Sequence, residues 1–465
     1  MNGTIAPHEY RVLERWLDAT IVDVTAGQVY GNGGTQWALS NSGEQLNLSH
    51  ASTTLDQTPL GAWVAGYNST ATRQTMERYS SRELGADPAN WGTNLGYIKN
   101  GIDANGNVIE GTPGAQNSVS TLINKGQNIT SDLALTNAEE HYVIATSTTV
   151  SASSTLAIAS GVVVQFYNTG NWPPPELNIL GTLHATGTPQ NPVIFESFSE
   201  DNAGSIYFVG SAGATSTLSN VFLSNISGIS IESGARVAMS DSALSNSGGI
   251  ALSGGSSIAI NNTHFASTTQ EALALSGGSS AVLASSTIEH AGTYGYGSDA
   301  IGLYGASSLL MSSTTIRDLV RNGNGVDLYE GSRAEIADSI IENMPRDSGV
   351  SAYDSFVSIA SSTIRNTVKD NGIALYNSTS TIANVVVENG KYAGIAVFDG
   401  TTTIKDSKVS GFGDAGVVIS AGTIANTEIF NNTIGVDMPS VGVILQDVSL
   451  HDNGINFVVD GVPVP

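Results

Sequence analysis

Short apolar runs recur along this chain with a period of about 22–28 residues, from Gly228 almost to Pro465. Successive copies open with glycine followed by alternating small and apolar residues, as in Gly325-Val326-Asp327-Leu328 and Gly372-Ile373-Ala374-Leu375. Each copy holds two further apolar runs, separated by Gly, Ser, Asn and Asp. Strands of period two cannot bury their apolar faces alone, whereas coils stacked on one another can. The pattern therefore predicts a β-solenoid.

We expect a right-handed parallel β-helix whose interior is filled by Ile, Val and Leu, with neighbouring coils about 4.8 Å apart. Leucine-rich and ankyrin repeats have a similar length but contain a helical segment. Repeats this rich in Ser, Gly and β-branched residues do not favour such a segment. The predicted solenoid spans residues 141–465 and follows a polar linker at 119–140.

The charge balance narrows the function classes. The chain has 17 basic and 41 acidic side chains, a net charge of −24, and no cysteine. No cluster of Lys and Arg is present to neutralise phosphates, so we expect no nucleic-acid partner. Disulfides, thiolate zinc sites and cysteine nucleophiles are excluded. No run of about 18 apolar residues occurs, so we expect no membrane insertion.

The composition is typical of an extracellular or cell-surface protein, although residues 1–4 do not resemble a signal peptide. The final residues, 461–465, resemble the start of a linker more than a polar cap. We therefore expect a monomer or one part of a longer multidomain chain.

Residues 1–118 differ from the repeats and hold four of the five tryptophans. They contain specific motifs at residues 3–10, 13–15, 39–48, 75–78, 87–91 and 111–118. These motifs are similar to the later strands and the closing segment of bacterial lamin-tail domains. The resemblance implies a partial immunoglobulin-like β-sandwich, lacking the opening strands, that serves as a surface accessory module without a catalytic motif.

The start of the solenoid carries a second resemblance. The runs at residues 156–166 and 181–195 are similar to the first coils of secreted bacterial β-helix proteins with a pectin-lyase-like fold. This resemblance implies an architecture, and many unrelated functions occur on that fold.

Aligning the copies places equivalent residues in columns. One outward column alternates in charge: Glu289, Arg317, Glu342, Arg365 and Glu388. We expect ion pairs between neighbouring copies, each contributing at most about 1 kcal/mol. The column at the following turn consists of His290, Asp318, Asn343, Asn366, Asn389 and Asn431. Asn and Asp tolerate a left-handed backbone, so this column predicts a repeated tight bend rather than a metal site.

A third column is aromatic, and an acidic and amide row lies one residue further on. Aromatic rings beside carboxylates and amides can stack on sugar rings and bind their hydroxyls. We predict a glycan-binding surface formed by Tyr304, Tyr329, Tyr353, Tyr376, Phe398, Asp354, Asn377 and Asp399. The alternatives are a stacked ladder that only stiffens the coil and a rigid structural spacer without a ligand.

A polysaccharide hydrolase or lyase is the alternative function. Hydrolysis needs two carboxylates about 5–9.5 Å apart, and the candidates are Asp327, Glu330 and Asp354. A lyase needs a basic proton acceptor. The basic residues near this surface are scattered: Arg333, Arg346, Lys369 and Lys391. The catalytic signatures of enzymes with this fold, such as Trp-x-Asp-His, are absent. We therefore expect a non-catalytic protein for adhesion, glycan binding or spacing.

Calcium is the one cofactor left open. The run Asp103-Ala104-Asn105-Gly106-Asn107 resembles the start of a calcium loop, but its glycine comes two positions early and no Glu occupies position twelve. We interpret it as a hairpin turn. The row of Glu330, Asp354 and Asp399 could hold a hard cation, and neither place is predicted as a metal site.

Overall fold

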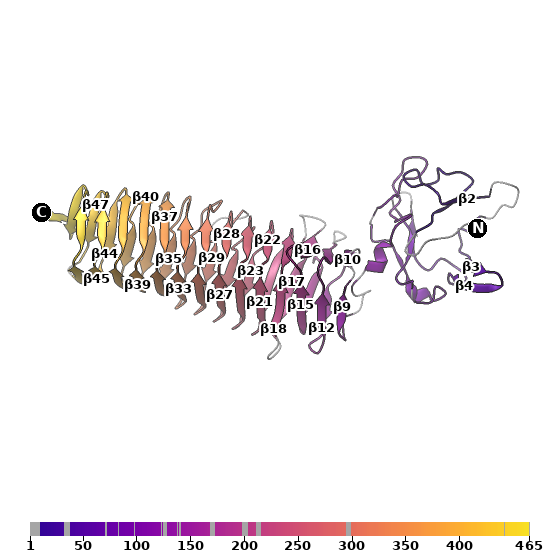
Figure 1. Cartoon of the computed structure of the whole chain (residues 1–465), viewed down its shortest axis with the longest axis horizontal. Coiled ribbons are helices and arrows are strands. Elements are labelled where there is room, and N and C mark those ends of the chain that lie inside the picture. Colours follow the sequence, from indigo (N-terminus) through magenta and orange to yellow (C-terminus); the bar gives the residue numbers. More distant parts are fainter. Residues whose placement is uncertain are drawn as a thin grey trace. The chain divides into compact units, whose positions relative to one another are not determined.

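The computed structural model divides the chain into two compact units. One comprises residues 1–126 and 141–145, and the other residues 127–140 and 146–465. The structure describes residues 10–31, 38–69, 72–81, 83–96, 98–121, 123, 128–136, 138, 141–167, 173–197, 203–210, 215–293, 299–440 and 442–464. The second unit is a parallel β-solenoid, and its stacked strands follow one another along the chain in Figure 1.

The solenoid has three sheets, which we call A, B and C, and from residue 148 onward each coil passes through them in this order. Sheet A consists of β11 (Thr148–Val150), β14 (Glu176–Ile179), β17 (Ser205–Val209), β20 (Gly228–Glu232), β23 (Ile250–Leu252), β26 (Leu273–Leu275), β29 (Ile301–Leu303), β32 (Val326–Leu328), β35 (Val350–Tyr353), β38 (Ile373–Tyr376), β41 (Ile395–Phe398), β44 (Ala415–Ile419), β47 (Ile434–Met438), β50 (Ile455–Val459) and β51 (Val462–Val464).

Sheet B consists of β9 (Leu133–Leu135), β12 (Thr155–Ile158), β15 (Thr182–Thr186), β18 (Thr215–Ser219), β21 (Arg236–Ser240), β24 (Ser257–Asn261), β27 (Ser280–Ala284), β30 (Ser308–Ser312), β33 (Arg333–Ala337), β36 (Phe356–Ala360), β39 (Thr379–Ala383), β42 (Thr401–Lys405), β45 (Ala421–Ala425) and β48 (Gly442–Gln446).

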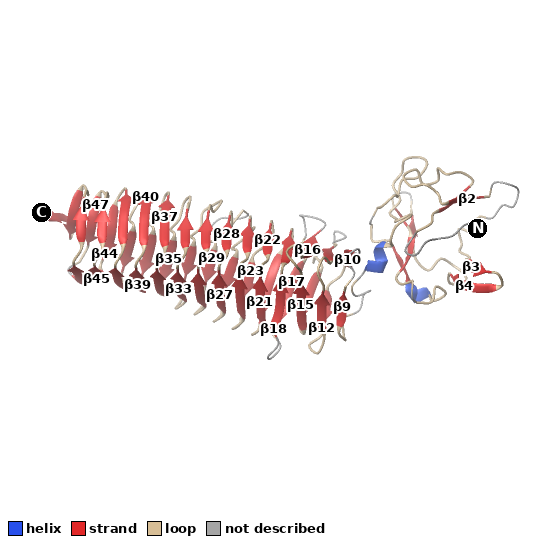
Figure 2. Cartoon of the chain, viewed as in Figure 1, coloured by secondary structure: helices blue, strands red, loops and turns tan. Residues whose placement is uncertain are grey.

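Sheet C includes β13 (Val163–Phe166), β16 (Val193–Ser197), β19 (Val221–Ser224), β22 (Ala243–Ser245), β25 (His264–Ala266), β28 (Thr287–Glu289), β31 (Thr315–Arg317), β34 (Ile340–Glu342), β37 (Thr363–Thr367), β40 (Val386–Gly390), β43 (Lys408–Phe412), β46 (Glu428–Phe430) and β49 (Ser449–His451). Figure 2 shows that strands make up nearly all of the solenoid.

Neighbouring coils pair in parallel with equivalent residues opposite each other. In sheet A, for example, Ile301 pairs with Val326 and Leu303 with Leu328. The inward column at this position is buried throughout, at 2 % exposure or less: Ile229, Ile250, Leu273, Ile301, Val326, Val350, Ile373, Ile395 and Val417. The predicted interior of Ile, Val and Leu is therefore confirmed.

Close approach of stacked coils explains why glycine opens copies such as those at Gly325 and Gly372. A Cβ on Gly325 would lie 2.5 Å from the carbonyl oxygen of Gly349 and 2.6 Å from Cγ2 of Ile341. Gly372 stands in the same relation to Gly394, at 2.5 Å. These glycines have no positive φ, so the need is for space and not for a left-handed backbone.

The corners between the sheets depend on two kinds of residue. The first adopts a positive φ, as at Asp338 (φ 49°) between sheets B and C. The predicted column of tight bends from His290 to Asn431 also has positive φ values, between 54° and 62°, and is thereby confirmed. The second is a buried Ser or Thr that directly follows the left-handed residue of the corner between sheets B and C. Ser339 donates its hydroxyl to Ala337 O at 2.7 Å and accepts the backbone N–H of Thr314 at 3.2 Å. Buried corner backbone is thereby hydrogen-bonded from coil to coil.

The outward charged column forms the expected ion pairs. Arg317 contacts Glu289 at 2.6 Å, and Arg365 contacts Glu342 at 2.6 Å. His264 joins the same column, with its Nε2 2.8 Å from Glu289. These half-exposed pairs fix the register of neighbouring coils at a small gain in stability.

The solenoid begins and ends differently from the sequence-based expectation. β9 pairs with β12, so the first strand lies inside the segment predicted as a linker. At the other end, β51 folds back on β50 as an antiparallel strand. Asp460 and Gly461 form the two-residue turn with φ values of 49° and 73°, which is the geometry of an Asp-Gly hairpin. This segment is a hairpin strand and not the start of a linker.

The first unit contains small sheets of two strands each. These are β1 (Leu13–Arg15) with β2 (Gln28–Tyr30), β3 (Asn47–His50) with β4 (Thr53–Gln57), β5 (Tyr67–Asn68) with β6 (Arg73–Gln74), and β7 (Met76–Arg78) with β8 (Trp91–Thr93). The unit also includes the 3-10 helices η1 (Pro88–Asn90) and η2 (Ser118–Thr121) and the strand β10 (His141–Ile144). The predicted immunoglobulin-like sandwich stays a prediction, and residues 3–9 of its first motif lie outside the described residues.

A buried carboxylate holds the motifs of the first unit together. Glu77 is 3 % exposed and accepts hydrogen bonds from the side chains of Asn94 at 2.7 Å, Thr112 at 3.0 Å and Ser118 at 2.6 Å. The backbone N–H of Val119 adds a further bond at 3.2 Å. A buried charge with this many donors is satisfied, so Glu77 has a structural role.

Replacement of Ser339 by Ala should lower the free energy of unfolding by about 1–3 kcal/mol, because the buried N–H of Thr314 loses its acceptor. Urea unfolding followed by circular dichroism measures the change. Ser308→Ala, at an exposed position of β30, is the matched control and should change stability by less than about 0.5 kcal/mol. Equal effects of the two substitutions would contradict the role given to the buried corner serines.

Candidate functional site

The aromatic column of sheet A forms a continuous stack. The rings of Tyr304 and Tyr329 have centroids 5.7 Å apart, followed by separations of 5.0, 4.5 and 5.2 Å toward Tyr353, Tyr376 and Phe398. The first three pairs are parallel within 5° and the last within 17°. The spacing follows the distance between coils, so the register of the sheet itself stacks the rings.

This stacking limits how the row could contact a sugar. Both faces of Tyr329, Tyr353 and Tyr376 are covered by neighbouring rings, so these side chains present only their ring edges. Burial raises the pKa of the Tyr304 and Tyr329 hydroxyls above the ordinary value. They therefore stay protonated and can donate hydrogen bonds at neutral pH.

The acidic and amide row beside the aromatic rings lies at the corner between sheets A and B. Glu330, Asp354, Asn377 and Asp399 all have a positive φ, between 47° and 58°, and their side chains are exposed. Asn377 donates its Nδ2–H to Oδ1 of Asp354 at 2.5 Å. Their first role is to supply the left-handed backbone that the bend requires.

The three predicted catalytic carboxylates do not share one surface. Asp327 lies in the middle of β32 and is 3 % exposed. Glu330 and Asp354 lie at the exposed corner beyond the rings. The structure therefore separates the buried Asp327 from the exposed Glu330 and Asp354.

The aromatic row ends at Tyr304, and a trough begins there. The preceding three positions of its column are Ser276, Ser253 and Glu232, as the strand register shows. The trough has a volume of about 280 Å³ and is lined by Glu232, Ala251, Leu252, Ser253, Ala274, Leu275, Ser276 and Tyr304. The small residues Ala251 and Ala274 leave this space beside the Tyr304 ring, which we call the Tyr304 trough.

A buried acidic column runs beside the head of the aromatic stack. Asp299 is 5 % exposed, and its Oδ1 accepts the backbone N–H of Asn324 at 2.6 Å. Burial raises the pKa of Asp299 to about 8, and the neighbouring charge of Asp327 adds to the increase. Near neutral pH this carboxyl group is therefore protonated to a large extent.

Asp327 and Glu271 complete the acidic cluster. Burial raises the pKa of Asp327 to about 6, although hydrogen bonds from Ser351 and Tyr329 oppose the increase. Its Oδ1 is buried and has no hydrogen-bond partner among the described residues. Burial likewise raises the pKa of Glu271, which accepts the hydroxyl of Tyr304 at 3.4 Å.

Asp327 is among the candidate site residues predicted from sequence, whereas Glu271 and Asp299 are not. The strand register shows that Glu271, Asp299 and Asn324 occupy equivalent positions two residues before β26, β29 and β32. The signal was therefore present in the column alignment. The longer segment between β28 and β29 interrupts the repeat period, so the equivalence of Glu271 and Asp299 is not apparent from sequence spacing.

Metal binding finds no support in the described residues. Among them, no group of three or more His, Cys, Asp or Glu side chains has the arrangement of a metal site. At Asp103–Asn107, the carboxylate of Asp103 accepts the backbone N–H groups of Asn105 at 2.9 Å and Asn107 at 2.8 Å. Ile102 and Val108 pair antiparallel across it, which confirms the predicted hairpin turn. No helix in the described part of the chain is long and apolar enough to cross a membrane.

The fold defines the chain as a parallel β-solenoid protein. The sequence profile described as "Right handed beta helix region" matches residues 193–298 and 293–434. The chain belongs to this family, and the predicted right-handed β-helix is thereby confirmed. A search of curated proteins found no match.

Several solved structures are similar at low identity. The periplasmic alginate epimerase AlgG is 13 % identical with a TM-score of 0.38, and the match covers 67 % of this chain and 77 % of that one. Tailspike protein 3 of bacteriophage CBA120 is 12 % identical over 72 % of this chain and 57 % of that one, with a TM-score of 0.35.

The catalytic unit of a GH87 α-1,3-glucanase from Streptomyces thermodiastaticus is 12 % identical over 65 % of this chain and 63 % of that one, with a TM-score of 0.30. These likenesses concern the fold alone.

The cluster predicts that stability falls as the pH rises. Because the native pKa of Asp299 exceeds the ordinary value, the native state keeps a proton that the unfolded chain releases between about pH 4 and pH 8. This contribution is fully present below pH 4 and is lost as the pH passes 8. Asp299→Asn should flatten the decrease and raise the melting temperature at pH 8 relative to the unsubstituted chain.

Scanning calorimetry between about pH 4 and pH 8 measures this difference. Asp338→Asn, at an exposed corner of the same solenoid, is the control. An unchanged pH slope in Asp299→Asn would show that Asp299 is not a protonated buried acid.

Proposed function

We propose that this protein is a non-catalytic carbohydrate-binding solenoid of the cell surface or extracellular space, and that the Tyr304 trough is its principal binding site. One observation carries the proposal: the aromatic stack ends at Tyr304 beside a concave space of about 280 Å³. One ring of a saccharide placed in the trough would continue the stack on the face of Tyr304. Aromatic faces are common platforms for such apolar ring surfaces.

The walls of the trough suit a sugar in both shape and polarity. Its floor is apolar because Ala251 and Ala274 present methyl groups. Ser253, Ser276 and Glu232 supply hydroxyl and carboxylate groups that can bind sugar hydroxyls. No Lys or Arg lines this space, so a neutral sugar fits the electrostatics better than an acidic one.

A polymer could extend from the trough along the edges of the stacked rings. In this direction it would meet the edges of the tyrosine rings and then the exposed amide and carboxylate groups of Asn377, Asp354 and Asp399. The aromatic residues from Tyr329 to Phe398 would then contact the polymer through their ring edges. The face of Tyr304 would provide the stacking contact.

Tyr304→Ala should weaken polysaccharide binding by about 10-fold or more, because truncation of a central aromatic anchor typically costs at least about 1.4–2 kcal/mol. Binding is measured by biolayer interferometry against an immobilised panel of neutral and acidic polysaccharides. Phe398→Ala, at the opposite end of the stack, is the matched control and should change the affinity less than threefold.

Two outcomes would contradict this assignment. If no polysaccharide of the panel binds, the solenoid is a spacer. If Tyr304→Ala binds as tightly as the unsubstituted chain, the trough is not the site. A loss in Phe398→Ala equal to that in Tyr304→Ala would place the ligand along the whole row of ring edges.

Cleavage of a polysaccharide is the second candidate function, and the acidic cluster favours it. A hydrolase needs one protonated and one ionised carboxyl group. Asp299 and Asp327, on neighbouring coils with pKa values raised to about 8 and about 6, meet this requirement near neutral pH. Both are 5 % exposed or less, so a polymer would reach them only after a ring of the stack had moved.

Incubation of the full chain with the same polysaccharides, followed by size-exclusion chromatography, distinguishes the two functions. Binding without shortening of any polymer is the result expected from our proposal. Shortening that is abolished in Asp327→Asn would replace the binding function by the enzymatic one.

We further propose that residues 1–118 form a lamin-tail domain and serve as an accessory module beside the solenoid. The motifs at residues 75–78 and 111–118 support this, because Glu77 hydrogen-bonds to Thr112 and Ser118 and so joins them in one core. An experimental structure of the full chain should show two facing antiparallel sheets in this region. Their absence would refute the assignment.

A further inference from the structure

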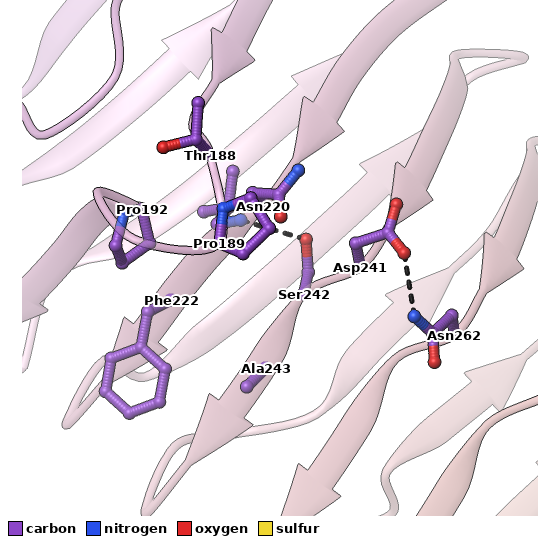
Figure 3. Close-up of a pocket in the computed structure, with 10 residues that line it drawn as sticks. Thr188, Pro189, Pro192, Asn220, Phe222, Asp241, Ser242, Ala243 and Asn262 are labelled. Atoms are coloured by element: carbon purple, nitrogen blue, oxygen red, sulfur yellow. Dashed lines mark hydrogen bonds between the residues drawn. The ribbon is translucent and has the colours of Figure 1, made fainter.

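A second concave surface lies on the other side of the coil, at the corner between sheets B and C. It has a volume of about 570 Å³, within the range of about 300–1,000 Å³ that is usual for ligand sites. It is lined by Thr188, Pro189, Pro192, Asn220, Val221, Phe222, Asp241, Ser242, Ala243 and Asn262 (Figure 3). We call it the Phe222 pocket.

A longer turn creates the pocket. Six residues, 187–192, connect β15 to β16, whereas only Asn220 separates β18 from β19. The long turn therefore overhangs the following coils, and Figure 3 shows Pro189 and Pro192 on this turn above Phe222.

Hydrogen bonds hold this wall in place. The N–H of Gly187 donates to Ser219 O at 2.8 Å, and the N–H of Val193 donates to Asn220 O at 3.1 Å. The carbonyl of Asn191 accepts the N–H of Gly161 at 3.0 Å and the hydroxyl of Ser160 at 2.7 Å. A turn tied to the coils on both sides forms a preformed wall, so binding there would cost little ordering.

The pocket combines an aromatic face with amide and carboxylate groups. Phe222 is 39 % exposed, and the next residue of its column is Ala243, which is too small to cover the ring. Asn262 donates its Nδ2–H to Oδ1 of Asp241 at 2.7 Å, as drawn in Figure 3. In the described part of the chain, Oδ2 of Asp241 has no hydrogen-bond partner, and it is available to accept a hydroxyl.

The charge of the lining selects the ligand class. Asp241 is the one charged residue among the lining residues, and none of them is Lys or Arg. An anionic group would therefore be repelled, and nothing there would neutralise a phosphate or a uronate. A neutral sugar offers hydroxyl donors for Asp241 and an apolar ring face for Phe222.

We infer that the Phe222 pocket is a second binding site, specific for a neutral oligosaccharide of about two or three sugar units. It lies on sheet C and its corner, whereas the Tyr304 trough lies on sheet A, so the two sites share no lining residue. A solenoid with two separate sites would bind a polysaccharide with two contacts and so increase its overall affinity.

The test titrates the full chain with maltohexaose, cellohexaose and laminarihexaose by isothermal calorimetry, up to about 10 mM sugar. Phe222→Ala should weaken binding of the recognised sugar by about 10-fold, and Phe222→Trp should retain it. Asp241→Asn should also weaken binding, because a carboxylate acceptor is lost while the contact to Asn262 can be kept.

His264→Ala is the control, because His264 follows Ala243 in the same outward column and does not line the pocket. It should leave the affinity unchanged. Phe222 is partly exposed, so its loss should leave the melting temperature within a few degrees of the original.

Tyr304→Ala separates this inference from the function proposed above. Loss of oligosaccharide binding in Phe222→Ala with retention in Tyr304→Ala supports the second site. Loss in Tyr304→Ala with retention in Phe222→Ala overturns it and leaves the trough as the site. Failure of all three sugars to bind also overturns it, because the pocket is inferred to take neutral sugars.

Discussion

The repeated in-register pairing of coils about 4.8 Å apart controls every other property of this solenoid. Each side chain has an equivalent neighbour above and below, so any residue type that recurs forms a ladder. Rings stack from Tyr304 to Phe398, corner hydroxyls bind the preceding coil, and glycines admit the next carbonyl oxygen. Opposite charges in such a ladder pair, as Arg317 does with Glu289, whereas like charges on neighbouring coils repel.

The candidate sites lie where this regularity is interrupted. Asp299 and Asp327 occupy neighbouring coils without a basic partner, and the cluster lowers its charge by retaining protons. The aromatic ladder stops at Tyr304 and leaves a trough. A turn longer than its successors overhangs Phe222 and closes a pocket. Local departures from an otherwise consistent pattern are where functional sites are expected.

The fold could be predicted from sequence because the register repeats the same physical requirement at each coil. Alternation of Leu328 and Tyr329 was enough to place one residue in the core and the other in the stack. Glu271 and Asp299 were not predicted, because the long segment before Asp299 interrupts the repeat period. Their equivalence follows from the pairing of β26 with β29, which the local sequence does not specify. The Asp460-Gly461 pair is typical of a two-residue hairpin turn. The prediction of a linker at 461–465 did not take this pair into account. The Phe222 pocket depends on how the turn at 187–192 packs over the coils that follow it, and no local sequence pattern specifies that packing.

We propose that the solenoid binds carbohydrate at the places where its regular pattern of coils is interrupted. Affinity electrophoresis of the full chain in native gels cast with individual polysaccharides tests it most directly. At least one neutral polysaccharide should retard the chain in proportion to its concentration, and the polymer should keep its length. Equal mobility in every gel would contradict the account and leave a rigid spacer as the function of this protein.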